Sequence, residues 1–136
     1  MTQQTWAFLG GKQVPEEEAV VGVKTHALHY GTAVFEGIRG NWNERLGKVV
    51  IFRLREHYER LIRGCQILRI NLPYSVADLC KITTDLLEKN GFSEDVYIRP
   101  LAFKGEQLVA NLNLNSVEDE FTLVIVPFGS YIDNSR

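Results

Sequence analysis

Cysteine and histidine are scarce in this chain, and neither is arranged as a disulfide or metal motif. The two cysteines among 136 residues, Cys65 and Cys80, fall in separate helical patterns and form no CxxC pair. This arrangement predicts two reduced, buried thiols. His26 and His29 are three residues apart, but no carboxylate or cysteine stands at ligand spacing beside them, so we expect no metal site.

Long apolar runs and an excess of basic charge are also missing. No apolar run approaches the roughly 20 residues of a membrane-spanning helix, and the acidic triplet at 16–18 stands where a secretion signal would be apolar. Lys and Arg number 15 and Asp and Glu 17, which gives a formal net charge of -2. We therefore expect a cytoplasmic protein without a membrane or nucleic-acid partner, because such partners need a clustered positive surface.

What the chain does have is an ordinary globular composition, 45% hydrophobic and 24% charged, sufficient for one domain with a real core. Ser75 and Asp78 predict a capping box, and Gly91 predicts a helix end. Strands and helices segregate along the chain, so we expect an α+β fold whose mostly antiparallel sheet carries two helices on one face. The expected strands are 6–9, 12–14, 33–39, 48–52, 95–103 and 120–128, and the expected helices are 55–69 and 76–90.

The stretch 26–40 reads HALHYGTAVFEGIRG and is the most informative part of the chain. Gly31 predicts a turn, and the alternating run after it predicts a strand. An aromatic ring beside a glycine-sized gap suits a planar or branched apolar ligand, whereas a packed strand with a glycine bulge is the alternative. If 33–39 is extended, one face carries Ala33, Phe35, Gly37 and Arg39, and the other carries Val34, Glu36 and Ile38.

A second informative strand reads VYIRP at 96–100 and places Tyr97 and Arg99 on one face. Arginine offers a rigid fork of donors and tyrosine adds a directed hydroxyl, so this face suits a carboxylate. A solvent-exposed strand face that carries a surface arginine is the alternative on these residues alone.

The string at 26–40 resembles the signature near the start of branched-chain amino-acid aminotransferases, which are pyridoxal-phosphate enzymes of the fold-type IV class. D-amino-acid aminotransferases and aminodeoxychorismate lyases of this class typically carry an acidic residue, an arginine and a glycine where this chain has HAL at 26–28. The segments REHYERL at 55–61 and YIRP at 97–100 also resemble the branched-chain enzymes. The resemblance covers the chain from Trp6 to Tyr131 and implies the small N-terminal domain of that fold.

The resemblance implies roles for individual residues. Arg60, in the ERL triplet, matches the arginine that binds the cofactor phosphate, a task that suits a bidentate guanidinium. Arg53, Arg55, Arg63 and Arg69 are expected to be solvated helix flanks. Tyr30 matches a tyrosine that reaches the active site across a subunit boundary, which implies a homodimer or a higher homo-oligomer. The substrate-binding residues that we expect are Tyr30, Phe35, Gly37, Arg39, Tyr97, Arg99 and Tyr131.

The resemblance also implies what this chain does not supply. Family members hold pyridoxal 5'-phosphate on a lysine of a second, larger domain, and none of the six lysines here lies in that motif. Lys81 and Lys89 are expected on helix surfaces, and the other lysines, Lys104 included, at strand edges or turns. We expect residues 1–130 to form the small domain, residues 131–136 to begin the interdomain linker, and the chain alone to be inactive.

In the complete enzyme, the resemblance implies amino transfer between leucine, isoleucine or valine and 2-oxoglutarate. Arg99 is expected to serve the extra carboxylate of glutamate and 2-oxoglutarate, which an apolar pocket must still accept. A non-catalytic interaction or dimerisation domain is the alternative from another class, because an isolated half of an enzyme exposes apolar surface. A D-amino-acid aminotransferase is the alternative within the fold-type IV class.

Overall fold

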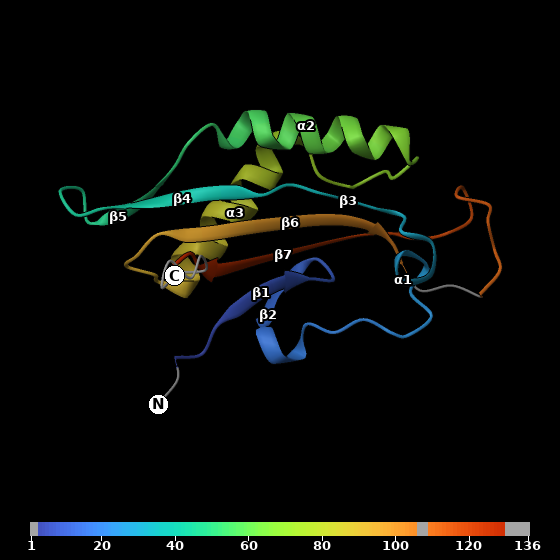
Figure 1. Cartoon of the computed structure of the whole chain (residues 1–136), viewed down its shortest axis with the longest axis horizontal. Helices are drawn as coiled ribbons and strands as arrows, with labels where there is room; N and C mark the ends of the chain where they lie inside the picture. Colours follow the sequence, from blue (N-terminus) through green and yellow to red (C-terminus); the bar gives the residue numbers. More distant parts are fainter. Residues whose placement is uncertain (1–2, 106–108, 130–136) are drawn as a thin grey trace, which may run out of the picture.

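The computed structural model describes residues 3–105 and 109–129, which form one antiparallel sheet with helices packed against it (Figure 1). In chain order the elements are β1 (Trp6–Leu9), β2 (Lys12–Pro15), a 3-10 turn η1 (Glu16–Glu18), α1 (His26–Tyr30), β3 (Ala33–Phe35), β4 (Ile38–Asn43), β5 (Lys48–Ile51), α2 (Leu54–Ile67), α3 (Val76–Asn90), β6 (Val96–Lys104) and β7 (Asp119–Pro127). The strand order is β2-β1-β7-β6-β4-β5, and β3 pairs with β6. The predicted α+β fold with a mostly antiparallel sheet is confirmed.

One face of the sheet is buried under α2 and α3. Ile98 of β6 and Leu123 of β7 point to this side and are fully buried. Leu61 of α2 and Leu86 of α3 are also fully buried and belong to the same cluster. Burial of apolar surface is the dominant favourable contribution to folding, so this cluster fixes both long helices on one side of the sheet.

The strand expected over 33–39 is divided into β3 and β4. The pairing of both strands with β6 nevertheless runs without a skipped residue, so the bulge alternative is wrong. Pro100 lies opposite the interruption and has no N–H to donate, while its carbonyl accepts a hydrogen bond from Glu36 N at 3.2 Å. The predicted alternation survives, because the exposed positions are Phe35, Gly37 and Arg39.

The two long helices follow their predicted signals closely. The helix expected over 55–69 ends two residues early, because Arg69 adopts a φ of 55° and leaves the helical conformation. The capping box is confirmed, with Asp78 N donating to Ser75 Oγ at 3.0 Å and Ser75 N donating to the Asp78 carboxylate at 2.9 Å. Gly91 forms the left-handed cap of α3 at a φ of 67°.

A third α-helix, α1, was not among the expected elements. It spans five residues, which is too short for an apolar period to be visible in the sequence. Gly31 ends it with a φ of 66°, and its N–H donates to Ala27 O at 2.9 Å. The predicted turn at Gly31 is therefore confirmed as a helix cap. Within the described parts of the chain, no helix combines the length and the apolar character that crossing a bilayer requires.

Two buried polar side chains tie the helical layer to the sheet. Lys104 is 1% exposed, and its ammonium donates to the Asp119 carboxylate and to Arg69 O at 2.8 Å. Asn90 accepts a hydrogen bond from Trp6 N at 2.8 Å and donates to Trp6 O at 3.1 Å. The expectation of Lys104 at a strand edge or turn is wrong, because it ends the interior strand β6 under the connection from α2 to α3.

Candidate functional site

Three aromatic rings and two guanidinium groups form a row on the face of the sheet opposite α2 and α3. Arg99 Cζ lies 4.0 Å from the centroid of the Phe35 ring, and its Nε and Nη2 donate to Tyr97 Oη at 3.0 and 2.6 Å. The Tyr97 ring stacks on Phe128 with centroids 5.6 Å apart. Arg39 Cζ lies 5.1 Å from the centroid of the same Phe128 ring. We call Phe35, Arg99, Tyr97, Phe128 and Arg39 the aromatic–arginine row.

Strand pairing explains how two distant motifs supply this row. In the antiparallel register of β4 and β6, Arg39 lies directly opposite Tyr97. Cross-strand neighbours on one face are close enough for their side chains to interact. The structure therefore brings together Phe35, Gly37 and Arg39 of the first predicted motif with Tyr97 and Arg99 of the second.

Gly37 makes room for the Tyr97 side chain. A Cβ atom on Gly37 would lie 2.6 Å from Tyr97 Oη, closer than real Cβ atoms come to another heavy atom, and 3.2 Å from Tyr97 Cε2, which is a tight contact. Only glycine leaves the phenol in its place beside Arg99. The gap that the sequence predicts at this position is thus partly filled by the chain's own tyrosine.

The row can hold a carboxylate beside an apolar group. Tyr97 Oη accepts both bonds from Arg99, so its own proton remains to be donated. Arg99 has further N–H groups that no contact among residues 3–105 and 109–129 uses. Phe35 is 54% exposed and supplies an apolar surface next to these donors.

Arg60 lies on α2, on the other side of β3 and β4, and is held by a buried carboxylate. Its Nε donates to Glu36 Oε2 at 2.9 Å and its Nη2 to Glu36 Oε1 at 2.8 Å. His57 Nδ1 lies 2.8 Å from the same Oε1. Burial alone would raise the pKa of the Glu36 carboxyl, but the hydrogen bonds and charges of Arg60 and His57 outweigh it, and the pKa lies below its ordinary value.

The depressed pKa of Glu36 makes part of the stability of the fold dependent on pH. A carboxyl whose pKa is lower in the folded than in the unfolded state stabilises the fold at any pH above its unfolded pKa. That stabilisation is lost as the pH falls through the pKa of the folded state. At neutral pH, Glu36→Gln is expected to lower the free energy of unfolding by about 1–3 kcal/mol, since it weakens a buried charge-assisted contact. Urea unfolding from about pH 7 to pH 3 should show this difference shrinking below about pH 4.5.

Glu59→Gln is the control for this prediction, because Glu59 forms an exposed pair with Arg55 on the same helix. It should change the free energy of unfolding by about 0.5 kcal/mol or less. A difference between Glu36→Gln and the unsubstituted protein that stays constant over the whole pH range would contradict the assignment.

Tyr30 does not join the aromatic–arginine row. It ends α1 at the end of the sheet, where its hydroxyl accepts a hydrogen bond from Ala110 N at 3.0 Å. His26 beside it is buried, and its ring nitrogens lie 2.8 Å from Thr32 Oγ1 and from Asn111 O. Both residues thus tie α1 to neighbouring loops. Tyr131 lies outside the described residues.

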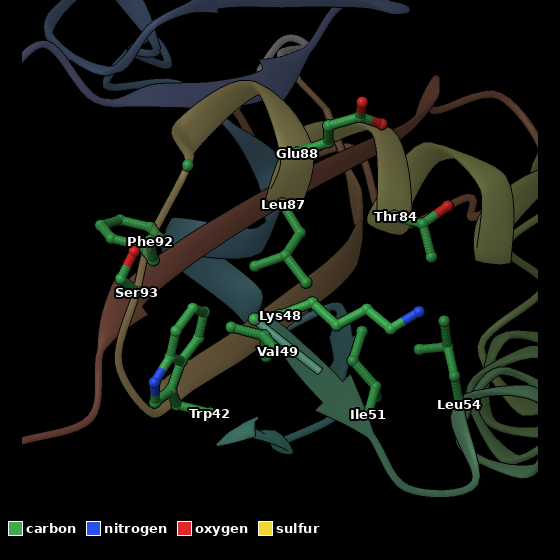
Figure 2. Close-up of a pocket in the computed structure, with 12 residues that line it drawn as sticks. Trp42, Lys48, Val49, Ile51, Leu54, Thr84, Leu87, Glu88, Phe92 and Ser93 are labelled. Atoms are coloured by element: carbon green, nitrogen blue, oxygen red, sulfur yellow. The ribbon is translucent and has the colours of Figure 1, made fainter. Parts of the chain in front are cut away.

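An apolar hollow of about 590 Å³ is lined by none of the predicted site residues that the structure describes (Figure 2). Figure 2 shows side chains from β4, β5, the start of α2, α3 and the turn after α3 around it. They include Trp42, Val49, Leu87 and Phe92, with Lys48 and Glu88 at the rim. The hollow contains no group that the predicted chemistry uses.

Sequence reasoning missed Glu36 as the partner of Arg60, and His57 as the second partner of Glu36. The alternation placed Glu36 on the same face as Val34 and Ile38, and a carboxylate on a core face is a signal that it has a partner. His57 precedes Arg60 by one helical turn, a spacing that puts both on one side of α2. Among the residues that the structure describes, no group of three or more His, Cys, Asp or Glu side chains could hold a metal ion.

Comparisons with known proteins match most of the chain. The family model described as amino-transferase class IV matches residues 33–132. A probable branched-chain-amino-acid aminotransferase from Aquifex aeolicus is 42% identical over 131 residues, which make up 96% of this chain and 42% of that protein. The branched-chain-amino-acid aminotransferase of Escherichia coli K12 is 38% identical over 130 residues, 93% of this chain and 40% of that protein. The chain thus spans about two-fifths of the length of these curated relatives.

Solved structures of branched-chain aminotransferases are similar to this chain in fold as well as in sequence. A branched-chain aminotransferase from the archaeon Thermoproteus uzoniensis, with norvaline, has a TM-score of 0.87 and 37% identity over 96% of this chain and 43% of its own. The T.th. branched-chain amino acid aminotransferase complexed with N-(5'-phosphopyridoxyl)-L-glutamate has a TM-score of 0.84 and 33% identity over 97% of this chain and 43% of its own. The likeness therefore concerns almost the whole chain and is not confined to one motif.

Proposed function

This chain belongs to the class IV aminotransferase family, and from that premise we propose that it forms the small domain of a branched-chain amino-acid aminotransferase. The proposed substrates are branched-chain amino acids, glutamate and 2-oxoglutarate, the proposed cofactor is pyridoxal 5'-phosphate, and the proposed location is the cytoplasm. The observation that carries the proposal is the aromatic–arginine row, in which Tyr97 and Arg99 offer carboxylate donors beside the ring of Phe35.

The donor set on α2 fits the phosphate of pyridoxal 5'-phosphate. Arg60 is 64% exposed at its side chain, and the guanidinium edge that faces away from Glu36 is not used by any contact of the described residues. A guanidinium edge binds two phosphate oxygens through charge-assisted hydrogen bonds. When bound, the cofactor supplies an electron-withdrawing ring that allows an amino group to move between carbon skeletons. Arg60 would hold the phosphate end of that cofactor.

The row would orient the substrate without taking part in bond making. Tyr97 and Arg99 would bind carboxylate oxygens, and a branched aliphatic side chain would pack against Phe35. Phe128 and Arg39 continue the row beside Tyr97 and would limit the space on that side. Tyr30 and Tyr131 are proposed to reach the substrate from a neighbouring subunit and from the interdomain linker.

The experiment that tests the proposal is a nitrogen-15 NMR titration of this chain with 4-methyl-2-oxopentanoate, a branched-chain 2-oxo acid. We expect millimolar binding with the largest shifts at residues 35–37 and 97–99, and weaker binding of pyruvate because it lacks the branched tail. Arg99→Ala should weaken binding about 10-fold or more, since it removes a charge-assisted donor. Arg45→Ala, at an exposed arginine in the β4–β5 turn, is the matched control. Shifts confined to the hollow in Figure 2 would contradict the proposal.

We also propose that this chain alone does not catalyse amino transfer. Lys104 is held by Asp119 and Lys81 by Asp85, and no described contact joins any lysine to the row or to Arg60. After incubation with pyridoxal phosphate and borohydride, intact-mass analysis should show only low, scattered labelling of exposed lysines. Stoichiometric labelling of one lysine would overturn this point.

Homo-oligomer formation is proposed from a group of exposed apolar side chains around α1. Val20, Val23 and Leu28 are 72%, 81% and 66% exposed, and Val109 and Leu112 lie on the loop that contacts α1. Exposed apolar groups of this kind mark association surfaces. Light scattering during size exclusion should show a concentration-dependent rise in mass that Leu28→Glu reduces. A constant monomer mass up to high concentration would contradict it.

A further inference from the structure

Glu36 is fixed before any ligand arrives. Its side chain is 8% exposed, and its backbone N–H donates to Pro100 O at 3.2 Å, at the interruption between β3 and β4. The sheet thus holds the backbone on both sides of this residue. A carboxylate placed so rigidly can orient a partner more strictly than one on a flexible surface loop.

The hydrogen bonds to Glu36 use only one edge of the Arg60 guanidinium. Nε donates to Oε2 at 2.9 Å and to Oε1 at 3.1 Å, and Nη2 donates to Oε1 at 2.8 Å. A guanidinium carries five N–H donors in one plane, so the Nη1 and Nη2 groups on the opposite edge still present donors. That outer edge lies on the exposed part of the side chain.

The surroundings of Arg60 favour an anion. Arg53, Arg63 and His57 line the same shallow hollow of about 290 Å³ with Arg60, and Glu56 is the one carboxylate among its lining residues. Glu56 lies 3.4 Å from Arg53 and makes no contact with Arg60 among the described residues. Basic side chains therefore outnumber the single carboxylate among the residues that line this hollow with Arg60.

We infer that Glu36 is a positioning residue that grips the inner edge of Arg60 and thereby turns the outer edge toward a phosphate group. This inference rests on the phosphate role of Arg60 in the proposed function. His57 adds a second hydrogen bond to the carboxylate, because it donates to Glu36 Oε1 at 2.8 Å and thereby restricts rotation of the carboxylate. A free arginine side chain has many rotamers, and their restriction beforehand lowers the entropic cost of binding.

Positioning by Glu36 and simple charge repulsion predict opposite effects on phosphate binding. If Glu36 were only a nearby negative charge, its removal would strengthen phosphate binding. If it positions Arg60, Glu36→Gln should weaken binding of inorganic phosphate about 3- to 10-fold in spite of the lost charge. Glu56→Gln is the matched charge control, because it removes one carboxylate from the same hollow without loosening Arg60, and it should leave affinity equal or slightly higher.

The experiment follows the guanidinium signals of Arg60 by nitrogen-15 NMR while inorganic phosphate is added at constant ionic strength. In the unsubstituted chain, the Nε–H signal should exchange slowly and stay nearly fixed, while the Nη signals shift. Arg60→Ala identifies the signals and should remove the specific response. In Glu36→Gln, the Nε–H signal should broaden and the phosphate response should weaken.

The results distinguish failure of the positioning role of Glu36 from failure of the phosphate role of Arg60. Equal strengthening in Glu36→Gln and Glu56→Gln would overturn the positioning role and leave the phosphate role of Arg60 intact. Absence of any Arg60 response to phosphate in the unsubstituted chain would overturn the phosphate role, and this inference with it. If Glu36→Gln does not fold, the unsubstituted chain still decides, because an Nε–H signal that exchanges rapidly shows that Glu36 does not grip Arg60.

Discussion

Replacing Lys104 with methionine is expected to lower the free energy of unfolding by about 3–5 kcal/mol, the usual effect of removing one member of a buried ion pair. Lys104 is 1% exposed, and its ammonium donates to Asp119 and to Arg69 O. Methionine fills a similar volume but leaves the Asp119 carboxylate without its cation. The other oxygen of that carboxylate accepts a hydrogen bond from Asn71 N at 2.9 Å, so the change also loosens the connection from α2 to α3.

Urea unfolding monitored by circular dichroism measures this effect. The control is Lys81→Met, since Lys81 is 76% exposed and pairs with Asp85 on α3, and its loss should change the free energy by about 0.5 kcal/mol or less. The double variant Lys104→Met with Asp119→Leu should recover part of the loss, because no isolated charge remains buried. A loss below about 1 kcal/mol for Lys104→Met would contradict the prediction.

Replacing Asn90 with alanine should lower the free energy of unfolding by about 1–3 kcal/mol, since it removes a buried amide and leaves two partly buried backbone groups of Trp6 without that partner. The Asn90 side chain accepts from Trp6 N at 2.8 Å and donates to Trp6 O at 3.1 Å. It also donates to Leu86 O at 3.1 Å, so one amide joins β1 to the last turn of α3. Hydrogen exchange of the Trp6 amide should accelerate in the same variant.

Asn90→Asp separates the donor from the acceptor function. It retains an oxygen for Trp6 N but turns a buried, unpaired carboxylate toward Trp6 O and Leu86 O in place of the donor, so at neutral pH it should destabilise the fold at least as much as Asn90→Ala. Asn115→Ala, at an exposed loop position, is the control and should change the free energy by about 0.5 kcal/mol or less. An Asn90→Ala protein as stable as this control would show that the amide bridge contributes little.

Most of the fold follows from local patterns in the sequence. The alternation in 96–103 and 120–128 and the apolar stripe of α2 reflect burial on one face, and burial leaves a regular period in the sequence. The capping box at Ser75 is a contact between near neighbours, which needs no information from elsewhere in the chain. The short helix α1 left no such period, and the interruption between β3 and β4 depends on Pro100 of another strand.

Part of the candidate site was also predictable from local patterns in the sequence. Alternation alone placed Phe35, Gly37 and Arg39 on one strand face and Tyr97 with Arg99 on another. The antiparallel register that joins the two faces, and the contact between Gly37 and the Tyr97 ring, are properties of the folded sheet. The site roles of these residues remain proposals that the titrations described above test.

The sequence by itself determined the fold class, the cap signals and the resemblance at 26–40, because these depend on residues close together along the chain. The tertiary structure decided which polar groups are buried and what they contact. Lys104 and Asn90 look like ordinary polar residues in the sequence, and the alternation places Glu36 on the core face without identifying its partner. Each of the three is buried against a partner at least 15 positions away. A buried polar group needs a hydrogen-bond partner, and where that partner is distant along the chain, the sequence around the buried residue does not identify it.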